Sequence, residues 1–222
     1  MSPIATIILR DATLAFRAGG GALQAVAFFA LAVLVFAFAV GPDLGLITRI
    51  SAPVLWASAL LATQISLDQI YRADREDGSL DVLVETADFL VIVALAKAAA
   101  HWLSTSLPLI AAAPLLGLVL NLPADAMGPL ILSLVAGTPA LALIGSFAAA
   151  LAVSLPRANL LISIIVSPLY VPVLIFGMGV AGAESFESPQ LWANFMLLSA
   201  TTILAALVSP IAAAAALRAN LD

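Results

Sequence analysis

The chain is dominated by long runs of apolar residues, several of them long enough to cross a lipid bilayer. A helix needs about 20 residues to span the roughly 30 Å hydrocarbon layer. Continuous apolar runs fit helices, whereas the strands of membrane barrels alternate apolar and polar residues. Only 9% of the residues are charged and mean hydropathy is +1.18, against about 25% charged residues in soluble domains. The sequence therefore predicts an all-α integral membrane protein.

Six spans fit within the 222 residues, which form a single transmembrane domain, 1–222. The predicted spans are 22–40, 50–67, 98–120, 129–155, 160–180 and 191–217. The apolar run 89–120 exceeds one span, so its first part is expected to protrude or to lie near the membrane surface. That places Lys97, His101 and Trp102 at the interface, where such side chains are common. A short interfacial helix is predicted over 1–18.

One polar stretch interrupts the apolar sequence between the second and third spans. The chain has 8 basic and 13 acidic residues, and nine of these charged residues lie between Asp68 and Asp88. With six spans, this stretch and both termini share one side of the membrane. That side carries six arginines, with Lys97 close by, whereas the other side carries Arg49 alone. Because Lys and Arg concentrate on the cytoplasmic side, we expect the stretch and both termini in the cytoplasm.

A short amphipathic helix is predicted within this polar stretch. Gly78 is a natural break, and Ser79 suits the N-cap of a helix that begins at Leu80. Four residues share an apolar face and three share a neighbouring acidic face: Leu80, Leu83, Val84 and Ala87, and Asp81, Glu85 and Asp88. Like charges at this spacing weaken an isolated helix, and the anionic inner leaflet repels them. Both facts favour a protein partner; the alternative is a solvated loop.

Several kinds of chemistry are missing from the sequence. The absence of cysteine excludes disulfides and thiol catalysis, and one histidine leaves little for a metal site. A P-loop needs G-x-x-x-x-G-K-[ST], and the single lysine, Lys97, follows an apolar run instead. We therefore expect no enzyme activity in this chain and ATP binding only on another subunit. The pI of about 4.6 reflects one acidic loop and gives no basic surface for nucleic acid.

A set of short motifs gives the chain a family resemblance. The motifs are Tyr71-Arg72-x-Asp74-x-x-Asp77-Gly78-Ser79-Leu80, Ala96-Lys97-x-x-x-His101-Trp102, Leu107-Pro108-Leu109, Gly137-Thr138-Pro139, Ser167-Pro168-Leu169 with Val171-Pro172, and Leu207-x-Ser209-Pro210. In this order and spacing they resemble the cytochrome c maturation protein B family, the membrane subunit of an ABC-type haem exporter. The resemblance covers most of the chain.

The resemblance implies an architecture and a set of partners. It implies an ABC-2-type permease in the bacterial inner membrane, with a cytoplasmic coupling helix between spans two and three. The implied partners are an ABC ATPase subunit, a second copy of the chain, other cytochrome c maturation membrane proteins and the lipid bilayer. No firmly bound cofactor is implied; haem enters as cargo. The implied ATPase docking residues are Arg72, Asp74, Arg75, Asp77, Gly78, Ser79, Leu80, Asp81, Leu83, Val84 and Glu85.

Alternatives stay open at this point. Lys97, His101 and Trp102 suit a contact with haem or with a transport pathway, but we favour membrane anchoring for these three residues. Weaker candidates for haem ligation are Met127, Met178 and Met196. The cargo could be a lipid or a drug, or the subunit could act mechanically and release haem from a chaperone without transporting it. A passive scaffold and an intramembrane enzyme are the remaining classes, and no nucleophile–base arrangement supports the enzyme.

Overall fold

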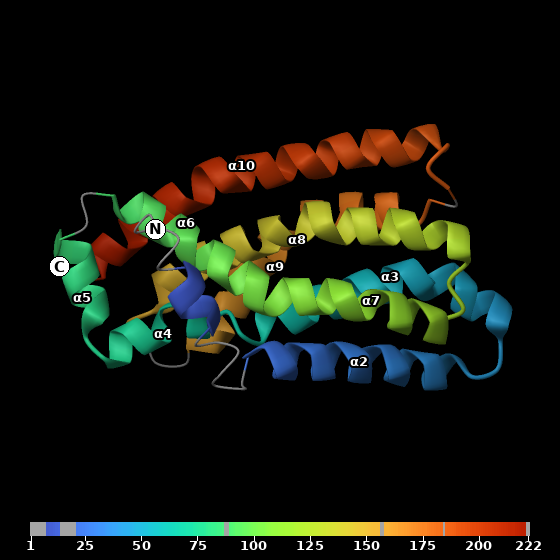
Figure 1. Ribbon diagram of the computed structural model, residues 1–222, viewed down its shortest axis with the longest axis horizontal. Coiled ribbons are helices and arrows are strands. Elements are labelled where there is room, and N and C mark those ends of the chain that lie inside the picture. The colour runs from blue at the N-terminus through green and yellow to red at the C-terminus, as the bar shows by residue number, and fades with distance from the viewer. Residues whose placement is uncertain (1–7, 14–20, 87–88, 156–157, 184, 221–222) are drawn as a thin grey trace.

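The protein is a bundle of long helices, as the apolar runs predict (Figure 1). The computed structural model describes residues 8–13, 21–86, 89–155, 158–183 and 185–220, which contain helices and turns without a strand. Residues 8–13 are helical; the rest of the predicted 1–18 helix lies outside the described residues. The other helices are α2 (Gly21–Val40), α3 (Leu44–Gln64), α4 (Gln69–Glu76), α5 (Ser79–Thr86), α6 (Leu90–His101), η1 (Trp102–Ser106), α7 (Leu107–Val119), α8 (Ala124–Ala152), α9 (Ala158–Ala181) and α10 (Pro189–Ala219).

Six segments are long and apolar enough to cross a membrane, which confirms the predicted all-α membrane fold. They are Leu23–Val40, Leu44–Glu76, Leu90–Val119, Ala124–Ala152, Leu160–Ala181 and Pro189–Ala219. The second starts earlier than predicted, because the Asp43 side chain accepts a hydrogen bond from the Leu46 backbone N–H, at 2.9 Å, and caps α3. The third starts at Leu90 and not near residue 98.

The third span changes its helical pitch once. Between α6 and α7, the five residues of η1 form a π-helical turn. Pro108, the second residue of α7, has no N–H to donate back to Ser104, so the regular i→i−4 ladder cannot run through this point. Such π-turns interrupt α-helices and are frequent at functional sites.

Helix α8 lies at the centre of the bundle and packs against α3, α6, α7, α9 and α10. The largest fully buried side chain, Trp56 on α3, lies against Gly137 of α8 and Gly177 of α9. Its Nε1 donates a hydrogen bond to Ser133 Oγ, at 2.8 Å. Close packing of one large ring against two glycines thus holds the core of the bundle together.

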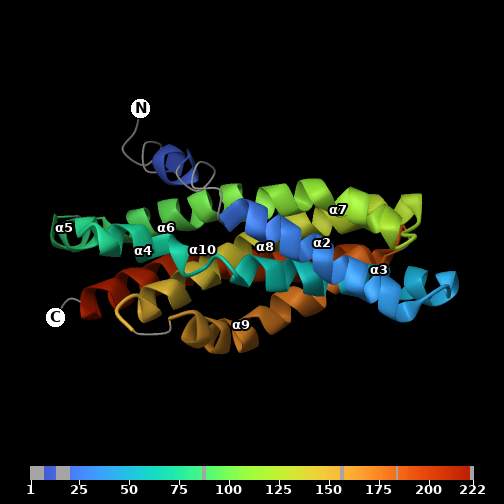
Figure 2. The ribbon, with the colours of Figure 1, turned by 90° about the horizontal axis from the view of Figure 1, so that it is seen from below.

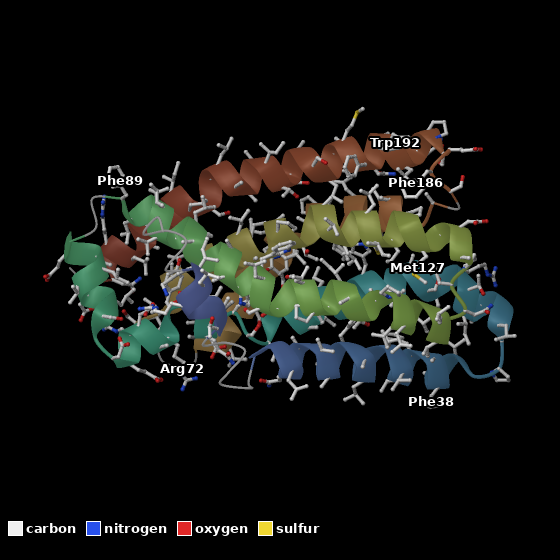
Figure 3. The ribbon with its side chains drawn as sticks, viewed as in Figure 1. Phe38, Arg72, Phe89, Met127, Phe186 and Trp192 are labelled. Carbon is white, nitrogen blue, oxygen red and sulfur yellow. The ribbon has the colours of Figure 1, made fainter. Side chains whose placement is uncertain are left out.

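The helices α4 and α5 lie at one end of the bundle, beside α6, the segment 8–13 and the last turns of α10 (Figures 1 and 2). The connections α2–α3, α7–α8 and α9–α10 lie at the opposite end. In Figure 3, Arg72 marks the α4 end, whereas Met127, Phe186 and Trp192 gather at the other. This arrangement agrees with six spans that alternate in direction. We call the first the coupling end.

Candidate functional site

The turn between α4 and α5 is fixed by its own sequence. Gly78 has a φ of +75°, a conformation that glycine adopts without strain. The Ser79 backbone N–H donates to Asp77 Oδ1, at 2.8 Å. Hydrogen bonds from the side chain and the backbone of Ser79 hold the pKa of Asp77 below its usual value. Ser79 is therefore the first residue of α5 and not its N-cap, and the Asp77 carboxylate, not the Ser79 hydroxyl, caps this end of the helix.

Helix α5 has the two faces that its sequence predicts. Leu80 is buried in the core, and Leu83 and Val84 are half-buried. Asp81 and Glu85 are exposed on the other side. Arg75 Nη1 of α4 lies 3.0 Å from Asp81 Oδ1 and ties the two helices together. Ala87 and Asp88, the remaining members of the two predicted faces, lie outside the described residues.

Helix α4 also divides into an outer and an inner side. Arg72 is exposed and pairs with Glu76 at 2.8 Å and with Asp68 at 3.5 Å. Tyr71 faces inward, and its hydroxyl is 2.8 Å from Ser146 Oγ of α8. Asp74 also faces inward, with 3% of its surface exposed. Of the predicted docking residues in α4, the two arginines thus face outward and Asp74 points into the protein.

Asp74 belongs to a group of four charges, Arg10, Asp11, Asp74 and Lys97, which we call the ionic cluster. Asp74 pairs with Lys97, and Arg10 Nη2 donates to Asp74 Oδ1 at 2.8 Å. Lys97 Nζ also donates to Asp11 Oδ2 at 2.9 Å. The Asp11 carboxylate raises the pKa of Arg10 above its ordinary value. Two positive and two negative charges from three separate segments therefore balance one another.

A polar cavity of about 340 Å³ lies beside this cluster. Its inner wall includes Ser66, His101, Ser104 and Thr105. His101 is buried, and its Nε2 has no hydrogen-bond partner among the described residues. Such a group is satisfied by water or by a ligand when it lines a polar space.

The structure corrects the predicted position of Lys97 and His101. Both side chains are buried inside the protein, so they do not anchor the chain at a lipid interface. The reason is tertiary packing: this face of α6 meets α4 and residues 8–13, which bring Asp74 and Asp11 to the Lys97 ammonium group. Trp102 is half-buried, and its Nε1 donates to Thr138 Oγ1 of α8 at 2.9 Å.

The methionines take no part in this site. Met127, Met178 and Met196, the weaker candidates for haem ligation, do not line the cavity. Met196 is exposed on the outer side of α10. In the part of the chain that the structure describes, no group of three His, Cys, Asp or Glu residues is placed to hold a metal ion.

The sequence missed Arg10, Asp11 and Tyr71 as members of the site. A lysine within an apolar run was the available signal, because an ionisable group in a membrane span needs a charged partner. The sequence could not say which carboxylate supplies it.

Known proteins resemble this chain along its whole length. Residues 2–220 match the family model described as CcmB protein. Heme exporter protein B of Bradyrhizobium diazoefficiens is 46% identical over 222 residues, which is 100% of both chains. Heme exporter protein B of Paracoccus denitrificans is 46% identical over 97% of this chain and 98% of the relative. That of Escherichia coli strain K12 is 36% identical over 94% of each. The chain, with its six spans and the charged helix pair at one end, belongs to the CcmB family.

Proposed function

We propose that this chain is the membrane subunit of an ABC-type haem exporter that serves cytochrome c biogenesis in the bacterial inner membrane. A separate ABC ATPase binds and hydrolyses ATP, and it docks on α4 and α5. Family membership and the names of the relatives support the role in haem export. The observation that carries the docking site is the α4–α5 pair, whose inner side is anchored in the bundle while its charged outer side faces away.

The proposed docking surface has a defined chemistry. Arg72, Arg75, Asp81 and Glu85 present both signs of charge on two short helices. Leu80 is inserted into the core and fixes the orientation of α5. Movement of a partner bound to this surface is therefore transmitted to the helix bundle and is not absorbed by a flexible loop. Two copies of the chain would pair with two ATPase subunits in this arrangement.

Charge reversal on α5 tests the docking site. Asp81→Lys with Glu85→Lys should abolish co-purification of the ATPase subunit in mild detergent, because two exposed charges change sign on the proposed contact. Asp125→Lys with Glu187→Lys makes the same charge change on exposed residues at the other end and should leave co-purification intact. Membrane insertion of both variants is checked first. Normal co-purification of the α5 variant would refute the docking site.

We also propose that the coupling end faces the cytoplasm. The support is the distribution of basic residues: Arg72, Arg75 and Arg218 belong to this end, whereas Arg49 belongs to the other. Because the chain contains no cysteine, single cysteines at Asp77 and Glu187 can be labelled without background. A membrane-impermeant thiol reagent added to intact cells should label position 187 and spare position 77. Labelling of both positions would contradict the six-span orientation.

A mechanical role is the second candidate. The centre of the chain is filled by Trp56, Tyr170 and Leu141, all fully buried. Two cavities, of about 340 and 480 Å³, lie at the coupling end and are not lined by these three side chains. This packing favours a subunit that transmits movement to a haem-handling partner over one that conducts haem through its own centre. Haem that accumulates outside the membrane in the absence of such a partner would exclude the mechanical role.

A further inference from the structure

The ionic cluster joins elements that are far apart in the sequence and that the docking site alone would not connect. We propose that Asp74 and Lys97 are positioning residues that transmit movement of α4 and α5 to α6. The inference rests on the proposed function, since it assumes that an ATPase subunit moves the α4–α5 pair. It adds the route by which that movement enters the third span.

The pairing of Asp74 with Lys97 is the link between the two helices. Asp74 is on α4 and Lys97 is on α6, and each is 3% exposed. The Lys97 ammonium also lies 5.7 Å from the centre of the Tyr71 ring, a second contact with α4. A charge that leaves water is strongly disfavoured unless a partner of opposite sign stays close. Separation of α4 from α6 would take from each of these two charges its most buried counter-charge, so the two helices are expected to move as one body.

Residues 8–13 brace this link from outside. Arg10 donates to Asp74, and Asp11 accepts from Lys97, so neighbouring residues of one segment hold opposite members of the pair. The Arg10 side chain is 47% exposed, whereas that of Lys97 is 2% exposed. Arg10 can therefore exchange its protein partner for water more easily than Lys97 can. Residues 8–13 can therefore leave the cluster, whereas the Asp74–Lys97 pair stays together.

Helix α6 ends where a rigid helix is easiest to bend. Lys97 lies one turn before His101, and η1 begins at the next residue. Beyond η1, Pro108 lacks the N–H that would restore the regular ladder. A displacement applied at Lys97 would therefore turn α6 against α7 at η1. The cavity beside Ser104 and Thr105 provides the polar space into which this part can move.

Variants of the pair test the link in the complete complex with its ATPase subunit. Asp74→Asn and Lys97→Met should each leave the ATPase subunit bound and ATP hydrolysis intact. Holo-cytochrome c formed per ATP hydrolysed should fall about tenfold or more, the effect of one lost charged contact. The exchange variant reverses all four charges, Asp74→Lys and Lys97→Asp together with Arg10→Asp and Asp11→Arg, and should restore much of this loss, because each ion pair of the cluster is kept with its signs reversed. Asp125→Asn, which neutralises an exposed acid at the other end of the bundle, should change nothing.

The outcomes separate the two proposals. Loss of the ATPase subunit from both single variants, with no recovery in the exchange variant, would overturn the link, because the pair would then only hold the docking surface together. A normal ratio of holo-cytochrome c to ATP in the single variants would overturn it as well. Failure of the α5 charge reversal to release the ATPase subunit would instead count against the docking site.

Distances between spin labels provide a second test, in which the Asp74–Lys97 pair itself is left unchanged. Spin labels at cysteines replacing Gln69 and Val91 report the distance between α4 and α6, and labels at positions 69 and 118 report that between α4 and α7. All three positions are exposed. On addition of a non-hydrolysable ATP analogue to the complex, the second distance should change and the first should not. Equal changes in both distances, or no change in either, would refute the proposal.

Discussion

The centre of the bundle and the ionic cluster at its coupling end are held together by different kinds of interaction. At the centre, the Trp56 ring fills the space left by Gly137 and Gly177. At the coupling end, four charges from three segments neutralise one another. Close packing allows a single arrangement of the side chains, because a slightly displaced ring would clash with neighbouring atoms. Ion pairs tolerate partner exchange, provided that each charge keeps a counter-charge.

This difference assigns different mechanical roles to the two regions. The packed centre fixes α3, α8 and α9 relative to one another and resists rearrangement. The coupling end can move as a unit, and Arg10 can exchange its partners at the surface. Substitutions at the centre should therefore lower stability, whereas substitutions at the coupling end should mainly change coupling.

The largest loss of stability is expected for Trp56→Ala. It leaves a cavity at the centre and removes the hydrogen bond to Ser133, so the free energy of unfolding should fall by about 3–5 kcal/mol. Trp192→Ala, at a half-exposed tryptophan, should cost less than about 1 kcal/mol. Unfolding in mixed detergent micelles, followed by circular dichroism, measures both. Similar losses at the two positions would mean that the centre is not specially packed.

Gly177→Ala tests the same packing from the other side. A Cβ at this position would lie 2.5 Å from Trp56 Cζ2, and the buried ring has no free space to move into. Overpacking of this kind should cost about 1–3 kcal/mol of unfolding free energy in the same detergent assay. The control is Gly45→Ala, whose Cβ would meet Asp43 Oδ1 at 3.4 Å, an ordinary contact. If Gly177→Ala proved as stable as Gly45→Ala, the description of the centre as rigid would be wrong.

A double-mutant cycle measures the coupling end in the same units. Asp74→Asn and Lys97→Met, alone and combined, should show a coupling energy of about 1–3 kcal/mol in unfolding, because each single change leaves the other buried charge with one partner fewer. The exposed pair Arg72 and Glu76 provides the control cycle and should show no measurable coupling. Equal coupling in the two cycles would remove the distinction between the buried cluster and the surface of α4.

Hydropathy predicted what depends on local sequence, and failed where the fold joins distant parts. The six spans and the two faces of α5 follow from apolar runs and helical spacing, and the structure has both. The partners of Lys97 could not be read in this way, because Asp11 is 86 residues distant in the sequence. With no partner in view, interfacial anchoring was the simplest interpretation of Lys97 and His101, and it was wrong.

The central packing was missed for a related reason. Trp56, Gly137 and Gly177 lie on three different helices, and nothing in the sequence of any one of them shows that they meet. The π-turn could not be read from the sequence either, because Pro108 marks a defect in the hydrogen-bond ladder without showing how the preceding turn adapts.

The smallest effect is expected at the exposed edge of the coupling end, where Asp77 caps α5. The pKa of Asp77 is lowered in the folded protein from an ordinary value of 3.8. A lowered pKa means that the cap is fully effective above about pH 3.8 and is lost as the pH falls through the lower folded value. A spin label at a cysteine replacing Glu85 should therefore become more mobile below that pH. Asp77→Asn keeps an acceptor oxygen that does not titrate, so the label should show less pH dependence. An unchanged pH profile in Asp77→Asn would show that the edge of α5 is held by the ion pair of Arg75 with Asp81 and not by its cap.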